Sequence, residues 1–261
     1  MDKVITQIDS RGVAQVTLNN PDKHNAFDDQ MIIELTNAFN ALAANTNVRI
    51  MLLKSEGKSF SAGADLDWMK RMASYSYQQN LNDARALAAM LKALHQMPIP
   101  TIARVQGAAF GGAVGLISCC DIALASSNAS FALSEVKIGL VPSTISPYVI
   151  AAIGERHAKR YFMTAERFDA NTAVQIELVH EAVEKSLLDD KVEQLVTAIL
   201  SNGPEAVAVA KQLIFAVSGK PINSKLIEHT CEVIAGIRVS PQGQEGLSAF
   251  LDKRKPNWLK D

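Results

Sequence analysis

The sequence predicts an α/β fold that ends in a helical segment. Over roughly the first 180 residues, short apolar runs of strand length alternate with segments whose apolar residues recur at helical spacing. From Asp189 onward the spacing is helical throughout. Prolines punctuate that segment, each near an expected helix start: Pro204, Pro221 and Pro241. The chain therefore combines an α/β part with an all-helical C-terminal part.

The N-terminal elements are expected to be a β-hairpin and a helix. Residues 4–8 and 13–18 have strand character, and Ser10-Arg11-Gly12 between them is a tight turn. Residues 19–26 contain a proline and are expected to form a loop. Asp28 is of a type that caps helices, and apolar residues then recur at helical spacing: Met31, Leu35, Phe39 and Leu42.

The middle of the chain is expected to contain buried strands, one long helix and two glycine-rich loops. The helix is predicted from Leu66 to Gln96, because Pro98 and Pro100 would end it. Residues 107–115 hold four glycines and then turn apolar, which indicates a tight turn leading into a buried helix. Strands are predicted at three short apolar runs: residues 48–53, 101–105 and 121–125.

Composition and charge narrow the classes of function. Hydrophobic residues make up 48% of the 261 residues and the net charge is -1, so nothing draws the whole chain to nucleic acid or to a membrane surface. No stretch approaches the roughly 20 apolar residues of a membrane span. The N-terminus lacks the pattern of a signal peptide, so we expect a cytoplasmic protein. The three cysteines are expected to be reduced, and no metal site is predicted because ligand spacing is absent.

The two glycine-rich loops, residues 59–65 and 107–113, are the candidate site. Each follows a buried strand and precedes a helix, so backbone N–H groups there could approach a ligand closely. Two such groups aimed at one point would form an oxyanion hole, suited to a thioester carbonyl that gains enolate charge. On pattern alone, glycines that only permit turns or close packing remain the alternative. Neither loop matches the sequence motif of a dinucleotide-binding loop or of a nucleotide-phosphate-binding loop.

Four motifs together resemble the enoyl-CoA hydratase/isomerase (crotonase) family. They run in order along nearly the whole chain: Asn20 to Ala26, Phe60 to Asp65, Gln106 to Gly112 with Asp121 beyond it, and Glu245 to Pro256. The resemblance implies a crotonase-like spiral of β-β-α turns over residues 1–195. It also implies a C-terminal helical domain, residues 196–261, that covers the active site and mediates assembly into a homotrimer or a homohexamer.

The resemblance also implies roles for individual residues. Ala64 and Gly112 match the backbone donors of the oxyanion hole. Coenzyme A, which is part of the substrate and not a separate cofactor, would be lined by Lys23, Ala26, Ala62 and Leu66. His24 lies in the same loop and could contact it. Phe250 and Lys253 match residues that reach its nucleotide, often from a neighbouring subunit; without the resemblance, Lys253 is a solvated charge in a basic run.

One catalytic carboxylate is implied, and a second is missing. The stretch ending at Glu135 resembles the motif that carries the second catalytic glutamate of family hydratases, and burial is expected to raise its pKa. The alternative is a glutamate at a helix start or on the surface. Gly115 stands where the first catalytic glutamate is usual. Residues 143–148 also depart from the family's glycine-rich loop.

Gly115 together with Ser-Pro-Tyr at residues 146–148 resembles the methylglutaconyl-CoA and isohexenylglutaconyl-CoA hydratase branch, from leucine and terpene breakdown. The leading hypothesis is thus a hydratase (lyase) acting on a branched or carboxylated 2-enoyl-CoA such as 3-methylglutaconyl-CoA. An acyl-CoA double-bond isomerase and a non-catalytic acyl-CoA-binding protein remain alternatives. Neither nucleic acid nor a membrane is expected as a partner.

Overall fold

The computed structural model describes residues 2–259, and its largest feature is a twisted, mostly parallel sheet. The strand order is β1-β2-β3-β4-β6-β9. Only β1 and β2 pair antiparallel, as the predicted hairpin; the other neighbours are parallel. The strands are β1 (Val4–Ile8), β2 (Val13–Leu18), β3 (Ile50–Ser55), β4 (Thr101–Val105), β6 (Ile122–Ser126) and β9 (Glu181–Val183).

A second, small sheet stands beside the first and carries the loops of the candidate site. Its strand order is β5-β7-β8, with β5 at Ala109–Phe110, β7 at Ser130–Ala132 and β8 at Phe168–Asp169. The parallel pairing of β5 with β7 places Phe110 opposite Ala132. This register fixes where the chain after β7 begins, and Glu135 lies three residues further on.

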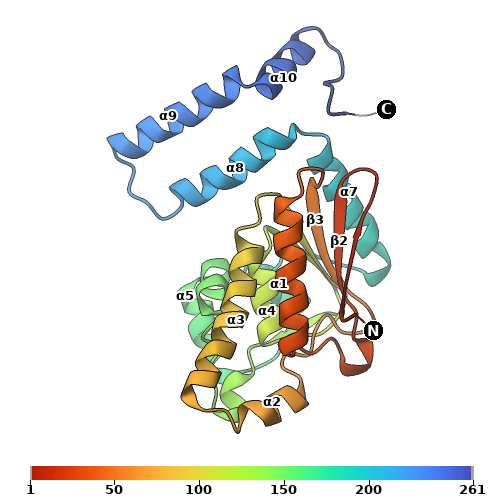
Figure 1. Ribbon diagram of the computed structural model, residues 1–261, viewed down its shortest axis with the longest axis vertical. Helices are drawn as coiled ribbons and strands as arrows, with labels where there is room; N and C mark the ends of the chain where they lie inside the picture. Colours follow the sequence, from red (N-terminus) through yellow and green to blue (C-terminus); the bar gives the residue numbers. More distant parts are fainter. Residues whose placement is uncertain (1, 260–261) are drawn as a thin grey trace.

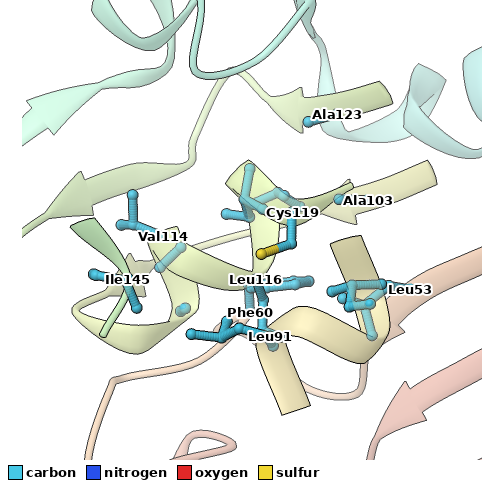
Figure 2. Packing of buried hydrophobic residues seen from close by; sticks show 14 of the residues in the cluster. Leu53, Phe60, Leu91, Ala103, Val114, Leu116, Cys119, Ala123 and Ile145 are labelled. Carbon is cyan, nitrogen blue, oxygen red and sulfur yellow. The ribbon is translucent and has the colours of Figure 1, made fainter. Parts of the chain in front are cut away.

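Both faces of the large sheet are covered, because alternate strand residues point to opposite sides. On one face Val16, Leu53 and Ala103 pack against α1 (Asp29–Ala44), α3 (Tyr77–His95) and α4 (Gly112–Cys119). On the other face Ile50 and Leu52 pack against α7 (Leu188–Leu200). Figure 2 shows the first of these cores close up, with Leu116 and Cys119 of the buried helix α4 surrounded by apolar side chains.

The predicted helix from Leu66 to Gln96 is wrong, since two helices occupy this segment. α2 spans Leu66–Met72, and α3 begins only at Tyr77. The break is made by Ser76, whose hydroxyl accepts the Gln79 N–H while the Gln79 side chain accepts the Ser76 N–H. This reciprocal cap starts a new helix. The sequence signal for it is the Ser-x-x-Gln spacing within the apolar pattern.

Other predicted elements are confirmed with small shifts. The strand expected at 101–105 is found as expected, and those expected at 48–53 and 121–125 lie at Ile50–Ser55 and Ile122–Ser126. Asp28 caps α1 by accepting the Met31 N–H. The short strands β5, β7, β8 and β9 were not predicted, because two or three residues carry no periodicity. The remaining helices are α5 (Ser146–Thr164), α6 (Ala170–Gln175), α8 (Pro204–Val217), α9 (Ser224–Val239) and α10 (Pro241–Leu251), with short 3-10 turns at Pro21–Lys23, Glu135–Ile138 and Lys185–Leu187.

After β9 the described chain is helical, as the sequence predicts. α8, α9 and α10 form a layer set apart from the sheet, whereas α7 lies against it (Figure 1). Residue 195 falls inside α7, and the division into domains at that point stays a prediction. The outer ends of the two predicted domains, residue 1 and residues 260–261, lie outside the described residues. None of the helices from residue 2 to 259 has the length and apolar character to cross a membrane.

The layer of α8 is attached to the sheet through an ion pair whose amine is buried. Lys211 on α8 is only 7% exposed, and its Nζ donates to Asp121 Oδ2 at 2.7 Å and to the Ile99 carbonyl at 3.0 Å. The same carboxylate oxygen accepts the Thr101 N–H at 2.7 Å. Because the amine is removed from solvent, it depends on the carboxylate for compensation, whereas Asp121 keeps part of its side chain in water.

Replacing Lys211 by Met should lower the free energy of unfolding by about 2 kcal/mol, since Asp121 loses the charge-assisted hydrogen bond from the buried amine. Urea denaturation followed by circular dichroism measures this loss. The matched control is Lys220→Met, because Lys220 is exposed beyond the end of the same helix. Equal unfolding midpoints for the two variants would contradict the role given to Lys211.

Candidate active site

The two glycine-rich loops lie side by side, joined by backbone hydrogen bonds. The Ala108 carbonyl accepts the N–H groups of Phe60 and Ser61 at 2.9 and 3.1 Å, and the Phe110 N–H donates to the Ser61 carbonyl at 3.0 Å. These bonds form a parallel bridge between Ser61 and Ala109. Segments almost fifty residues apart in sequence are thereby held in one register, so the starts of α2 and α4 adjoin each other.

In this arrangement the backbone N–H of Ala64 is a free hydrogen-bond donor. Phe27 forms a parallel bridge with Ala64 by donating to the Gly63 carbonyl and accepting the Asp65 N–H, both at 2.7 Å. In such a bridge the residue in the middle uses neither of its own backbone groups toward the partner. The Ala64 N–H therefore points away from Phe27, and it meets no acceptor within residues 2–259.

Gly112 supplies a second free donor nearby. It is the first residue of α4, where backbone N–H groups have no partner within the helix. The carbonyl four residues earlier, that of Ala108, is already taken by the other loop. A methyl group added to Gly112 would lie 3.5 Å from the Phe27 ring. Phe27 thus contacts both loops, and the expectation that the Ala64 and Gly112 N–H groups converge on one point stays a prediction.

Glu135 lies against Gly111, the residue that precedes the donor Gly112. The Gly111 N–H donates to Ala132 at the end of β7, and a methyl group added to Gly111 would lie 3.1 Å from Glu135 Oε1. Glu135 Oε2 is buried and has no hydrogen-bond partner in the described part of the chain. Burial raises the pKa of this carboxyl group, as the sequence analysis expected. A buried, unpartnered carboxyl oxygen at the start of α4, where the Gly112 N–H is free, is suited to moving a proton to or from a bound ligand.

The space in front of Gly115 is already filled. Gly115 lies one helical turn beyond Gly111 and Gly112, on the same side of α4. A methyl group added there would come within 2.3 Å of Ile145 Cγ2 and 2.7 Å of Ile145 Cβ. Ile145 is 2% exposed and lies beside α4 near Val114 (Figure 2). A glutamate at position 115 would therefore require Ile145 to move, which gives the missing carboxylate a steric reason.

The loop expected to line coenzyme A is clamped to the first glycine-rich loop. Asn25 is buried, and its amide donates to the carbonyls of Glu56 and Ser59 at 2.8 and 3.0 Å. The Ala62 N–H donates to the His24 carbonyl at 3.0 Å, and His24 Nδ1 lies 3.2 Å from the Ser59 hydroxyl. The structure thus brings His24, Ala26 and Ala62 to one edge of the candidate site.

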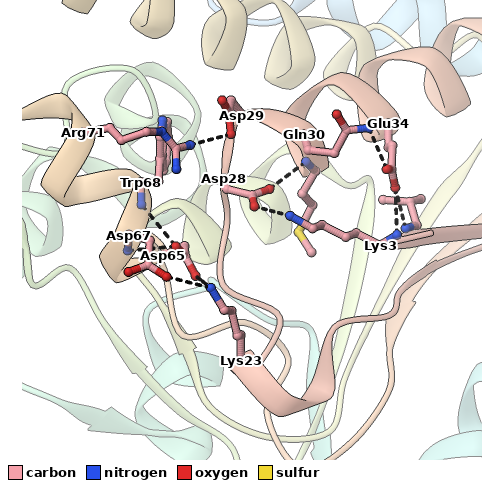
Figure 3. Close-up of polar contacts among 12 residues, drawn as sticks. Lys3, Lys23, Asp28, Asp29, Gln30, Glu34, Asp65, Asp67, Trp68 and Arg71 are labelled. Carbon is pink, nitrogen blue, oxygen red and sulfur yellow. Dashed lines mark hydrogen bonds and ion pairs between the residues drawn. The ribbon is translucent and has the colours of Figure 1, made fainter. Parts of the chain in front are cut away.

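Lys23 is held by two carboxylates at the start of α2. Its Nζ lies 2.9 Å from Asp65 Oδ2 and 3.1 Å from Asp67 Oδ2 (Figure 3). A hydrogen bond to Asp65 raises the pKa of Lys23. Burial opposes ionisation of Asp65, but hydrogen bonds from Lys23 and from the Trp68 and Asp67 N–H groups together lower its pKa. Lys23 therefore closes the loop against α2, and a coenzyme A phosphate would share it with these aspartates.

Of the residues assigned to coenzyme A, Leu66 directly follows the first glycine-rich loop at the start of α2 and is 72% exposed. Phe250 and Lys253 are not brought to the site by contacts of this chain. Phe250 is 82% exposed on α10, and Lys253 follows that helix. α10 lies at the opposite end of the molecule from α2 (Figure 1). Phe250 and Lys253 could reach a ligand only at the site of another subunit, as the resemblance implies.

Sequence reasoning missed Phe27 and Ile145. Phe27 directly follows the matched motif, but nothing in the pattern indicates that its backbone pairs with Ala64. Ile145 lies in the departing stretch 143–148, and its contact with Gly115 joins positions thirty residues apart. Residues 2–259 contain no group of three or more His, Cys, Asp or Glu side chains placed to hold a metal ion.

Comparison with known proteins agrees with this architecture. The family described as enoyl-CoA hydratase/isomerase matches residues 9–261. An enoyl-CoA hydratase from Shewanella pealeana is 48% identical with a TM-score of 0.94, covering 98% of this chain and 96% of that chain. A crotonase structure from Legionella pneumophila is 47% identical with a TM-score of 0.95, covering 99% and 100%. The 2,3-dehydroadipyl-CoA hydratase of Escherichia coli is 29% identical, over 94% of each chain. The chain belongs to the enoyl-CoA hydratase/isomerase family, with the crotonase fold.

Proposed function

We propose that the protein is an enoyl-CoA hydratase that works with a single protein carboxylate, Glu135. The observation that carries this proposal is the buried Glu135 Oε2, which has no partner among the described residues, in a side chain that lies against Gly111, the residue before the free N–H of Gly112. Membership of the family makes an acyl-CoA thioester the substrate class. A thioester held next to such a carboxylate can gain or lose a proton at its α carbon.

In the proposed reaction, the thioester oxygen accepts hydrogen bonds from Ala64 and Gly112. The Glu135 carboxylate takes a proton from water as the water oxygen bonds to C3, and the electron pair of the C2–C3 double bond moves to the thioester oxygen. The two N–H groups stabilise this enolate charge. Protonated Glu135 then delivers the same proton to C2, the carbonyl re-forms, and the carboxylate is regenerated. The sum is addition of one water molecule across the double bond.

The substrate we propose is a branched or carboxylated 2-enoyl-CoA such as 3-methylglutaconyl-CoA. Gly115 supports this, since a site with one carboxylate fewer repels an anionic acyl group less. A relative at 29% identity is named as a hydratase of 2,3-dehydroadipyl-CoA, a thioester of a dicarboxylic acid. The reverse reaction, loss of water from the 3-hydroxyacyl thioester, uses the same groups.

We also propose assembly into a trimer or a dimer of trimers. The C-terminal helices support it, because they expose large apolar side chains that a monomer leaves in water: Ile214, Ile227, Ile234, Leu247, Phe250 and Leu251. In such an assembly Phe250 and Lys253 would contact coenzyme A bound to a neighbouring subunit.

The second candidate is an acyl-CoA double-bond isomerase. The filled space at Gly115 favours it, since moving a proton between C2 and C4 needs one carboxylate and no water. Reaction in ¹⁸O-labelled water followed by mass spectrometry distinguishes a hydratase from an isomerase. Only a hydratase adds water to its substrate, so only its product gains the mass of one labelled water molecule. A protein that binds acyl-CoA without turnover would give neither product.

Glu135→Gln should lower the rate of water addition by ~10³ to 10⁴, because the amide keeps the shape of the side chain but cannot take a proton. Binding of a saturated acyl-CoA should persist, since the backbone donors are untouched. Stopped assays with 3-methylglutaconyl-CoA and crotonyl-CoA measure the rate, and calorimetry measures binding. A variant that keeps more than about a tenth of the wild-type rate would assign the proton transfer to another group.

The pH profile should reflect the raised pKa of Glu135. Water addition needs the ionised carboxylate, so kcat/KM should fall as the pH is lowered through a pKa above the ordinary glutamate range. The measurement is kcat/KM for hydration across the acidic pH range, with the residual activity of Glu135→Gln as control. If the acidic limb persists unchanged in that variant, it belongs to a different group.

A further inference from the structure

We propose that Ile145 determines the acyl specificity of the site by forming an apolar wall against one side of C3 of the substrate. The wall accepts hydrogen or a methyl group there and rejects a larger or charged substituent. This inference rests on the proposed hydratase function, because it takes the thioester to lie between Gly112 and Glu135. It assigns to Ile145 the space that a second catalytic carboxylate would need.

The geometry of α4 places this wall near C3. Gly111 lies against Glu135, Gly112 carries the free N–H, and Gly115 follows one turn later on the same side. Three residues of α-helix advance about 4.5 Å. The Gly112 N–H points beyond the start of α4, so a thioester oxygen bound there at about 3 Å lies in front of the helix, and the proposal has C2 and C3 run back along the helix toward Gly115. With Glu135 at one end of the stretch from Gly112 to Gly115, Ile145 stands at the other.

Ile145 occupies this position tightly. Its Cγ2 and Cβ would be 2.3 and 2.7 Å from a methyl group on Gly115, and Leu91 Cδ2 would be 3.6 Å from it. Ile145 is 2% exposed and Leu91 is fully buried. The wall is therefore apolar and backed by core side chains. It offers no partner for a carboxylate, and burying an unpaired charge against it would be costly.

The backbone holds Ile145 in place. Ile145 precedes α5, and its carbonyl accepts the N–H groups of Tyr148 and Val149 at 3.1 and 3.0 Å. Ser146 bonds back to the Ser143 carbonyl, and the Tyr148 ring packs on His95 of α3 with centroids 5.0 Å apart. A wall fixed by a helix start and by packing cannot retreat for a larger substituent without disturbing the core.

For 3-methylglutaconyl-CoA the two substituents at C3 are thereby distinguished. The methyl group packs on Ile145, and the carboxymethyl group turns away from the apolar wall. Gly115 and Ile145 together have two effects on the site. The site lacks a second carboxylate, and the side chain of Ile145 occupies the space of that carboxylate and recognises a branch at C3.

The test compares 3-methylglutaconyl-CoA with its 3-ethyl homologue in wild type, Ile145→Ala and Ile145→Val. One methylene against a fitted apolar wall changes kcat/KM by about 10- to 200-fold. We expect wild type to prefer the methyl substrate by at least tenfold, Ile145→Ala to bring the ratio to within about threefold, and Ile145→Val to fall between. The matched control is Ile153→Ala, because Ile153 lies in the helix that follows Ile145 and in the same core at 4% exposure, and it is not among the side chains nearest to Gly115.

Binding of the saturated thioesters, 3-methylglutaryl-CoA and 3-ethylglutaryl-CoA, is measured in parallel by calorimetry. The Kd ratio should shift as the rate ratio does, and Ile145→Val carries the test if the alanine variant does not fold. Equal methyl-to-ethyl ratios in wild type and the Ile145 variants overturn the inference. A wild type that hydrates no 2-enoyl-CoA, yet shows the shift in binding, refutes the proposed function and leaves the wall at Ile145 standing.

Discussion

The hydrogen bonds that join the two glycine-rich loops are the constraint on which the rest of the site depends. Ala108 binds the Phe60 and Ser61 N–H groups, and Phe27 binds on both sides of Ala64. Because these bonds consume the neighbouring backbone groups, the N–H groups of Ala64 and Gly112 are left without partners among the described residues. The small sheet then carries the constraint further, since the pairing of β5 with β7 sets Glu135 against Gly111. Donors and carboxylate are positioned by backbone pairing, which is more rigid than side-chain contact.

The second constraint is steric, and it connects chemistry to selectivity. A carboxylate at position 115 and an isoleucine at position 145 cannot share the same space, given a separation of 2.3 Å for even a methyl group. This chain has the isoleucine. The consequence is one carboxylate at the two positions where the family resemblance implies two. In the proposed reaction Glu135 therefore both activates water and protonates C2. Burial raises the pKa of Glu135 above the ordinary value of a glutamate, which suits a group that must both accept a proton and donate one.

Much of the fold could be predicted from the sequence because its elements have strong local signals. Strand Thr101–Val105 and the cap at Asp28 are decided by residues close together in the chain. The break at Ser76 was missed because continuous apolar spacing hid a capping box, and the two-residue strands were missed because they have no period. In the site, the motifs pointed to two loops that adjoin in the structure and to Glu135, whose catalytic role stays a prediction. The roles of Phe27 and Ile145 depend on contacts between segments thirty or more residues apart, which no local pattern encodes. The ion pairs of Lys23 with Asp65 and Asp67 likewise appear only when the chain is folded (Figure 3).

The central claim is that the thioester lies between the free backbone donors and Glu135. The most direct measurement is a crystal structure of the protein with a bound, unreactive acyl-CoA such as butyryl-CoA. The account predicts the thioester oxygen at about 3 Å from both the Ala64 and the Gly112 nitrogen, with C2 and C3 lying between Glu135 and Ile145. A thioester oxygen bound by neither nitrogen, or an acyl chain that does not pass between Glu135 and Ile145, would contradict it.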